Sequence, residues 1–478
     1  MRSPTLARSK SASAACWKRS KKGGAAMPQN EERVVFTREM KKDYTILVPT
    51  MLPIHFKLML NILRAYGYKC ELLENTGKPV VDAGLRSVHN DTCYPALLVI
   101  GQMIDALESG KYDLNKVALM ISQTGGGCRA SNYIHLLRKA LKKAGMGQIP
   151  VISLSASGME PNPGFKLTPT MIDRIFYAIL YGDLLMLLAN QCRPYEIERG
   201  ESDRLVDRWS RRLTGEMKGR GLLSYHQVKQ NYRAILRDFA AVPRRKEEKV
   251  KVGIVGEIYV KFSPLGNNNL EEFLLQEGAE PVVPGLLDFC LYCVYNMLMD
   301  HKLYGLNSRI KQEILERFYH MLVKKQADVI DAIQSEGSFR PGGYFPHTVD
   351  LTRGYINHGV KMGEGWLLTA EMLELIEQGV CNIVCTQPFG CLPNHIVGKG
   401  MMRAIKERHP ESNIVAVDYD PGATRINQEN RIKLMLANAV SIAEEKKQKP
   451  EPVRRRPRYA DEFPPEEETS RMAMTIKM

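Results

Sequence analysis

The sequence predicts an α/β fold with two parallel-sheet lobes and helical insertions. Short apolar runs alternate with amphipathic helical stretches in residues 44–160, and the same alternation returns in residues 250–440. Residues 161–249, between these regions, show helical periodicity and no clear strand. Strands that alternate with helices form βαβ units, and the strands of such units are parallel.

The first lobe is expected to begin with a buried strand at residues 44–49, followed by an amphipathic helix at 54–66 that Gly67 ends. A strand at 69–73 leads to a polar loop around Cys93, and Pro95 then suits the first turn of a helix at 95–107. The remaining elements are a strand at 117–122, a helix at 133–144 and a strand at 151–154.

Residues 161–249 are predicted to form a helical insert, with helices at 171–190 and 222–239, that ends in a charged linker. The second lobe then has strands at 250–256, 280–284, 382–386 and 413–418. Its expected helices are 269–277, a long helical region at 286–335, a helix that runs to residue 408 after Cys391, and a closing helix at 428–439. Both lobes are therefore expected to be Rossmann-like, and ligands of such sheets bind outside the carboxyl ends of the strands.

The charge and the terminal segments exclude several classes of protein. Seven basic residues and no acid fall in the first 26 residues, so about half of the net charge of +14 comes from a head, residues 1–43, that we expect to be disordered. Met27 is an alternative start. The tail, residues 441–478, is also expected to be disordered. No basic helix interleaved with aromatics indicates a nucleic-acid partner, and no apolar run is long enough for a membrane span.

The ten cysteines are too few and too irregularly spaced for a secreted disulfide scaffold, so we expect a reducing, cytoplasmic compartment. Three of them, Cys93, Cys128 and Cys391, lie in loops rich in Gly, Pro, Asn or Asp, each just before a helical stretch. The positive end of a helix dipole favours a thiolate, and thiolates bind soft metals and iron–sulfur clusters. Three such loops, meeting in the cleft between the lobes, are expected to hold a 4Fe–4S cluster by three corners.

For any one of these cysteines, burial as a small apolar residue is the simpler explanation. The occurrence of all three in tight polar loops favours a metal site. Cys385, six residues before Cys391, is a reserve ligand, whereas the pair Cys290 and Cys293 is better explained by a buried helix. Glu257 is either a general base or a helix cap. Side chains beside the ligand loops are expected to orient the ligands or to make plain loop hydrogen bonds: Asn90, Arg129, Gln387 and His395.

Five motifs together resemble the 2-hydroxyacyl-CoA dehydratase superfamily, and in particular the dehydratase-like portion of the large acyl-CoA dehydratase activase-related proteins. The resemblance covers about residues 44–440. The motifs are Asn90-Asp91-Thr92-Cys93-Tyr94-Pro95, Gly126-Gly127-Cys128-Arg129, Val255-Gly256-Glu257-Ile258-Tyr259, Gly363-Glu364-Gly365-Trp366 and Gln387-Pro388-Phe389-Gly390-Cys391-Leu392-Pro393-Asn394-His395.

The resemblance implies one 4Fe–4S cluster on Cys93, Cys128 and Cys391, with an open iron that meets the thioester carbonyl of an acyl-CoA substrate. It also implies that an ATP-dependent activase supplies one electron, after which hydroxide leaves from an unactivated position, and that the protein forms homo- or hetero-oligomers. A related branch carries a double cubane and reduces small molecules. The sequence has no Asp-x-Gly-Ser/Thr phosphate-binding start, so we expect no ATP hydrolysis by this chain alone.

Two alternatives from other classes stay open. The chain could be a non-catalytic scaffold that associates with an activase, or it could bind zinc through the same cysteines. Zinc would be colourless and insensitive to air, and it usually takes a fourth protein ligand.

Overall fold

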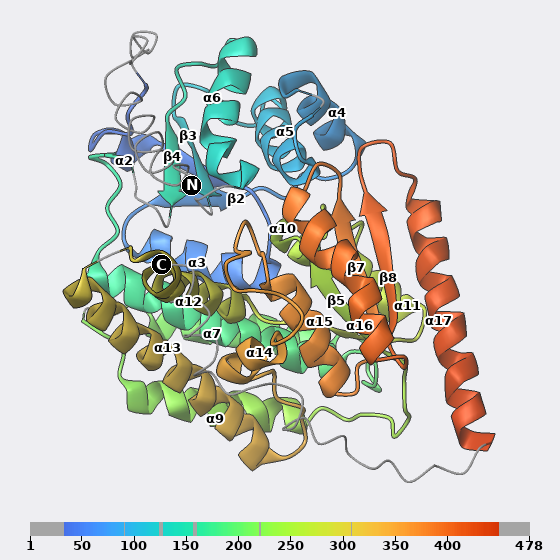
Figure 1. Cartoon of the computed structure of the whole chain (residues 1–478). Coiled ribbons are helices and arrows are strands. Elements are labelled where there is room, and N and C mark those ends of the chain that lie inside the picture. The colour runs from blue at the N-terminus through green and yellow to red at the C-terminus, as the bar shows by residue number, and fades with distance from the viewer. Residues whose placement is uncertain are drawn as a thin grey trace, which may run out of the picture. The chain divides into compact units, whose positions relative to one another are not determined.

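The computed structural model describes residues 33–89, 91–123, 128–155, 160–218, 221–306 and 308–448, and it contains two four-stranded sheets (Figure 1). Every strand pair in both sheets is parallel. The α/β fold with two Rossmann-like lobes is therefore confirmed. Both sheets belong to one compact unit that extends to Met435.

The first sheet has the strand order β2-β1-β3-β4. Its strands are β1 (Thr45–Val48), β2 (Lys69–Leu72), β3 (Val117–Gln123) and β4 (Val151–Ser155). Ile46 lies opposite both Cys70 and Ala118 in the register, and all three are buried. The apolar runs form strands because both faces of a parallel sheet are covered by helices.

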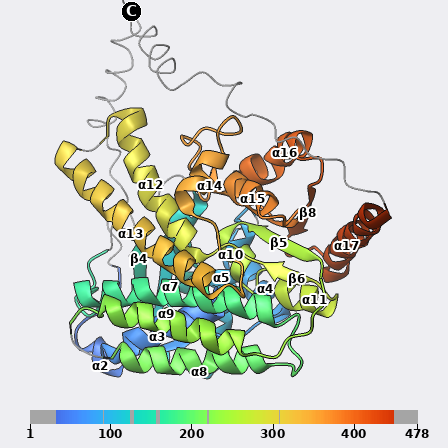
Figure 2. The same ribbon diagram turned by 90° about the horizontal axis from the view of Figure 1, so that it is seen from below.

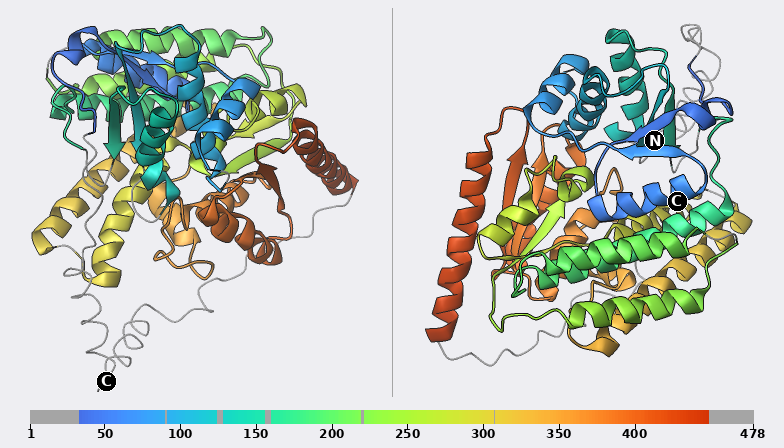
Figure 3. Two further views of the ribbon diagram at one scale, coloured as in Figure 1. Left: turned by 90° about the horizontal axis from the view of Figure 1, so that it is seen from above. Right: turned by 180° about the vertical axis from the view of Figure 1, so that it is seen from behind.

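Four helices accompany this sheet: α3 (Pro53–Ala65), α4 (Lys78–Ser87), α5 (Tyr94–Glu108) and α6 (Tyr133–Lys143). The two blue helices α4 and α5 lie against each other (Figure 3). A β-carbon at Gly101 would lie 2.2 Å from the Val80 carbonyl oxygen, so only glycine permits this close approach. Helix α4 has a polar sequence and was not expected.

The insert consists of three helices, α7 (Pro169–Cys192), α8 (Glu201–Glu216) and α9 (Tyr225–Ala240), that run side by side (Figure 2). Sequence analysis missed α8, whose first turn is acidic. Helix α7 carries Asp183, which accepts hydrogen bonds from the backbone amides of Leu286 and Leu287 at 2.8 Å and contacts His55 Nε2 at 2.7 Å. Asp183 therefore joins α7 to the first lobe and to the start of α12.

The second sheet has the order β6-β5-β7-β8. Its strands are β5 (Lys251–Gly256), β6 (Glu280–Val282), β7 (Asn382–Pro388) and β8 (Asn413–Tyr419). The helices are α10 (Ile258–Phe262), α11 (Leu270–Gln276), α12 (Leu286–Tyr304), α13 (Arg309–Glu336), α14 (Phe345–Leu351), α15 (Leu367–Glu377), α16 (Met402–Arg408) and α17 (Arg425–Gln448).

Several further segments differ from the sequence-based expectation. Helix α10 was not expected, and α17 continues to Gln448, into the tail of residues 441–478 that was expected to be disordered. The helix expected between Cys391 and residue 408 is divided into a π turn (Asn394–Gly398), a 3-10 turn (Lys399–Met401) and α16. Helices α14 and α15 were not expected at all. Within the expected disordered head, α2 (Met40–Asp43) is formed and Phe36 is fully buried, while residues 1–32 lie outside the described part. No helix in the described part is long and apolar enough to cross a membrane.

Candidate functional site

The three loop cysteines lie at the carboxyl ends of the two sheets or at a helix start. Cys93 is the N-cap residue of α5, and Cys128 is the N-cap residue of the short 3-10 helix Arg129–Asn132. Cys391 follows the end of β7 by three residues. Cys128 and Cys391 therefore follow the carboxyl ends of β3 and β7, the strands that the sequence predicts before them.

The Cys93 and Cys391 loops, one from each lobe, are in direct contact. The backbone amide of Tyr94 donates a 3.0 Å hydrogen bond to the carbonyl of Phe389. Gly390 has φ +72°, and a β-carbon there would lie 3.1 Å from Cys93 Cα. A glycine is needed at this position both for its conformation and for the close approach of the two loops.

The Cys128 loop reaches the same region through Gly363. A β-carbon at Gly363, whose φ is +60°, would lie 3.7 Å from Cys128 Sγ and 3.2 Å from Pro393 in the Cys391 loop. Three loops that are far apart in the sequence thus meet in one place. We call Cys93, Cys128 and Cys391, with the carboxylates Glu257 and Glu364 beside them, the cysteine site.

Burial raises the pKa of all three thiols, that of Cys128 to about 11. The helix-dipole argument favours the opposite direction, whereas burial is the largest cause of the shift at all three positions. The carboxylates Glu257 and Glu364 raise the pKa of Cys128 and Cys391 further. Without a bound cation the thiols are therefore neutral, and ligation to a metal would deprotonate them.

Three groups lower the pKa of Cys93 against the effect of burial. The Tyr133 hydroxyl lies 3.2 Å from Cys93 Sγ, and Tyr133 is buried at the start of α6. The backbone amide of Ala96 and the guanidinium of Arg129, which hydrogen-bonds to the Asp91 carbonyl, also favour the Cys93 thiolate. These three groups stabilise negative charge at Cys93.

Glu257 and Glu364 form a pair of buried carboxyls beside the thiols. Glu257 caps α10 by accepting from the Val260 amide at 2.9 Å, and Glu364 accepts from the Ile258 amide at 3.0 Å. Burial raises the pKa of both, and the neighbouring Glu364 contributes to raising that of Glu257 to about 8. Glu257 is therefore a helix cap that also holds a proton near neutral pH.

The remaining residues predicted for the site differ in burial and in their surroundings. Gln387 is buried at the end of β7, and neither its Oε1 nor its Nε2 has a hydrogen-bond partner in the described part of the chain. His395 is exposed. Cys385 packs in the apolar core of the second sheet, 3.7 Å from Asn394 Oδ1, so its surroundings favour packing. Asn90 and the Gly125–Gly127 loop lie outside the described residues.

Sequence reasoning missed the roles of Glu364 and Tyr133. Glu364 lies between Gly363 and Gly365, which both have positive φ. This Gly-Glu-Gly pattern, in one of the motifs that carry the family resemblance, was the signal available in the sequence. Tyr133 lies 40 residues from Cys93 in the chain, and nothing in its local sequence marks it. The pair Cys290 and Cys293 lies on α12, as expected for a helix, and Glu364 raises the pKa of the Cys293 thiol.

The donor chemistry of the cysteine site fits an iron–sulfur cluster. Three loops that each carry a free cysteine are in contact, and the buried amide of Gln387, which has no hydrogen-bond partner in the described residues, lies four residues before Cys391. In the described residues no group of three His, Cys, Asp or Glu side chains is placed to hold a metal ion. Zinc needs all its sulfur ligands about 2.3 Å from one ion, whereas a cluster binds each thiolate to a different iron atom.

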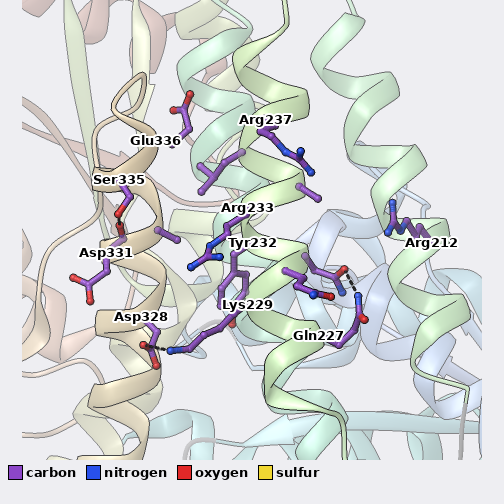
Figure 4. A pocket seen from close by; sticks show the side chains of 15 residues that line it. Arg212, Gln227, Lys229, Tyr232, Arg233, Arg237, Asp328, Asp331, Ser335 and Glu336 are labelled. Carbon is purple, nitrogen blue, oxygen red and sulfur yellow. Dashed lines mark hydrogen bonds and ion pairs between the residues drawn. The ribbon is translucent and has the colours of Figure 1, made fainter.

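Two open pockets lie away from the cysteine site, and none of the three cysteines lines either of them. One, of about 910 Å³, lies between α9 and α13 (Figure 4). There Lys229 and Asp328 form an ion pair at 2.6 Å across the pocket. The other, of about 940 Å³, lies beside the charged linker and the amino end of β5. Neither is at the carboxyl edge of a sheet, where ligands of this fold class bind.

No family model matches the chain, and no curated protein matches it. The fold and the geometry of the site are therefore the findings from which a function is argued.

Proposed function

We propose that this chain is an iron–sulfur protein in which Cys93, Cys128 and Cys391 hold one 4Fe–4S cluster. The observation that carries the proposal is the contact of three cysteine loops from both lobes. The Cys93 and Cys391 loops are joined by the 3.0 Å hydrogen bond between Tyr94 and Phe389, and Gly363 brings the Cys128 loop to them. Separate loops that each contribute one thiol suit a cluster ligated at three irons.

The reaction that fits best is a radical dehydration of a 2-hydroxyacyl thioester, or a related reduction, supported by an ATP-dependent activase. When bound, the cluster would accept an electron of low potential and leave one iron open to a substrate oxygen. The resemblance of five motifs to the 2-hydroxyacyl-CoA dehydratase superfamily supports this assignment. An acyl-CoA substrate, a separate activase and an oligomer are part of the same proposal.

The side chains of the site have separate tasks in this proposal. Arg129 and the Tyr133 hydroxyl offset negative charge at Cys93. Burial raises the pKa of Glu257, to about 8, and that of Glu364, so that both favour the protonated form beside the place where hydroxide would leave. A protonated carboxyl can give its proton to the leaving hydroxide, which then departs as water. Oxygen-sensitive thiol chemistry of this kind suits a reducing, cytoplasmic compartment.

The first test is the iron and acid-labile sulfide content, with the visible spectrum, of protein purified without oxygen. We expect a brown protein with about four irons and four sulfides per chain. Twice that content would indicate a double cubane. A colourless protein that cannot be reconstituted with iron and sulfide would overturn the proposal.

Single serine variants test the ligands. Cys93→Ser, Cys128→Ser and Cys391→Ser should each lose most of the iron. Cys70→Ser is the matched control, because Cys70 is equally buried but lies within β2. If the three variants keep full iron content while Cys290→Ser loses it, the ligand assignment is wrong.

A further inference from the structure

Beyond the cysteine site, a file of buried carboxyls extends along α15. Glu364 lies in the turn before α15, and Glu371 and Glu374 follow on the helix itself. The three-residue step from Glu371 to Glu374 places both on one face of the helix, and Glu371 is close enough to Glu364 to raise the pKa of that carboxyl. Asp288, at the start of α12, continues the file. The four carboxyls are all at least nine-tenths buried.

The inner part of the file is tied to the cysteine site. Glu364 accepts from the amide of Ile258, the residue after Glu257. One turn after Glu257, Lys261 forms a buried ion pair with Glu371 at 2.7 Å. The second oxygen of Glu371, Oε2, has no hydrogen-bond partner in the described residues. A buried carboxyl oxygen without a partner marks a position where a water or a proton completes the network.

The outer part of the file reaches the protein surface. Glu374 and Asp288 line a small pocket of about 50 Å³, which has room for one or two waters. The exposed Gly342 also lines it, so the pocket opens to solvent. At Gly343 a β-carbon would lie 2.0 Å from Glu374 Oε1, so the backbone lies directly against this carboxyl.

The charges within the file do not balance if every group is ionised. Glu257, Glu364, Glu371, Glu374 and Asp288 are five buried acids, and Lys261 is the cation paired with one of them. Neighbouring buried carboxyls cannot all be ionised, so some hold protons. In agreement, burial raises the pKa of Glu374 to about 7 and that of Asp288 well above its usual range.

We propose that Glu364, Glu371, Glu374 and Asp288 form a proton path between the small pocket and the cysteine site. A proton from water in the pocket passes from carboxyl to carboxyl through bridging water and reaches the site. There it joins the hydroxide that leaves the substrate, so that H⁺ and OH⁻ give one water and no electron moves along the path. The identity of this proton acceptor rests on the proposed function.

The test uses the full chain with its cluster reconstituted. Stopped-flow mixing transfers the oxidised protein into D₂O buffer, while infrared absorbance follows the exchange of the protonated-carboxyl bands. Because the path carries protons between the small pocket and the cysteine site, the bands that Glu374→Gln retains should exchange at least about tenfold more slowly in this variant than in the wild type. Glu377→Gln, on the same helix but exposed and paired with His347, should behave as the wild type. Equal exchange rates in Glu374→Gln and the wild type, or no exchangeable carboxyl band in the wild type, would overturn the path.

A second measurement separates this proposal from the proposed function. If no iron binds, the function fails, but infrared spectroscopy of the cluster-free protein still tests the file. The wild type at neutral pH should show protonated-carboxyl bands that shift in D₂O, and Glu374→Gln should lack part of them. If the wild type has no such band, the file carries no protons and the proposal is wrong.

Discussion

At the scale of single residues, burial and hydrogen bonding act in opposite directions on Glu374, because burial raises the pKa of its carboxyl and its hydrogen bonds lower it. Its Oε2 contacts the Thr348 hydroxyl at 2.7 Å, and its Oε1 accepts from Gln378 Nε2 at 3.1 Å. The Thr348 hydroxyl also lies 3.3 Å from the Tyr344 carbonyl. The Thr348 hydroxyl donates to Glu374, which favours the ionised carboxylate, so burial is the cause of the raised pKa.

This arrangement predicts how Glu374→Gln changes the pH dependence of stability. Burial raises the folded-state pKa of Glu374 from about 4.5 to about 7, so the folded wild type binds more protons than the unfolded chain between these values. The free energy of unfolding contributed by this group is present at low pH and is lost as pH rises through 7. The amide has no such loss, since it mimics the protonated acid.

We expect Glu374→Gln to gain about 3 kcal/mol relative to the wild type between pH 5 and pH 8. Urea unfolding at a series of pH values measures the difference, with the exposed Glu377→Gln as the control. Parallel stability curves for Glu374→Gln and the wild type would show that Glu374 is ionised throughout.

At the scale of elements, the close contact between the Cys93 and Cys391 loops predicts an unusual sensitivity at Gly390. Alanine there meets both an unfavourable φ of +72° and the Cα of Cys93 at 3.1 Å. Gly379→Ala is a matched control, because its φ is +79° and nothing lies within 4 Å of the added carbon. Each variant should lose about 1 kcal/mol of stability from its backbone conformation.

Only Gly390→Ala is expected to lose iron as well, because it separates two ligand loops. Iron content and thermal unfolding of both variants, purified without oxygen, provide the measurement. Equal iron contents would mean that the two loops do not need this approach to hold a cluster.

The same elements show how far sequence reasoning reaches. Strands such as Val117–Gln123 were predicted to within one residue, because a buried strand is a short apolar run between turn residues. Helix α15 was missed although it is almost entirely buried, because a helix that is apolar on several faces has no clear period, and its buried glutamates mimic a polar surface. The site cysteines were found from their loops, whereas Tyr133 and Glu371 acquire their roles only through tertiary contacts.

At the scale of the whole molecule, two of the contacts within the main compact unit predict independent effects on stability. The cysteine site joins loops of both lobes, and a cluster bound there stabilises only the folded state. The second connection is the contact of His55 with Asp183, which also caps α12. These two groups share no partner among the contacts described above.

Removal of iron with a chelator should therefore lower the thermal midpoint of the wild type, and it should have little effect on Cys391→Ser, which already lacks a ligand.

His55→Ala should cost about 3 kcal/mol, since His55 is fully buried with the backbone of Gly182 packed against its ring. Because the sites share no partner, the losses from iron removal and from His55→Ala should add to within about 0.5 kcal/mol. Thermal unfolding of wild type and His55→Ala, each with and without iron, completes the cycle. A His55→Ala protein that no longer responds to iron would instead mean that the cysteine loops come together only when α7 is fixed to the first lobe, so that cluster binding and docking of the insert are one cooperative step.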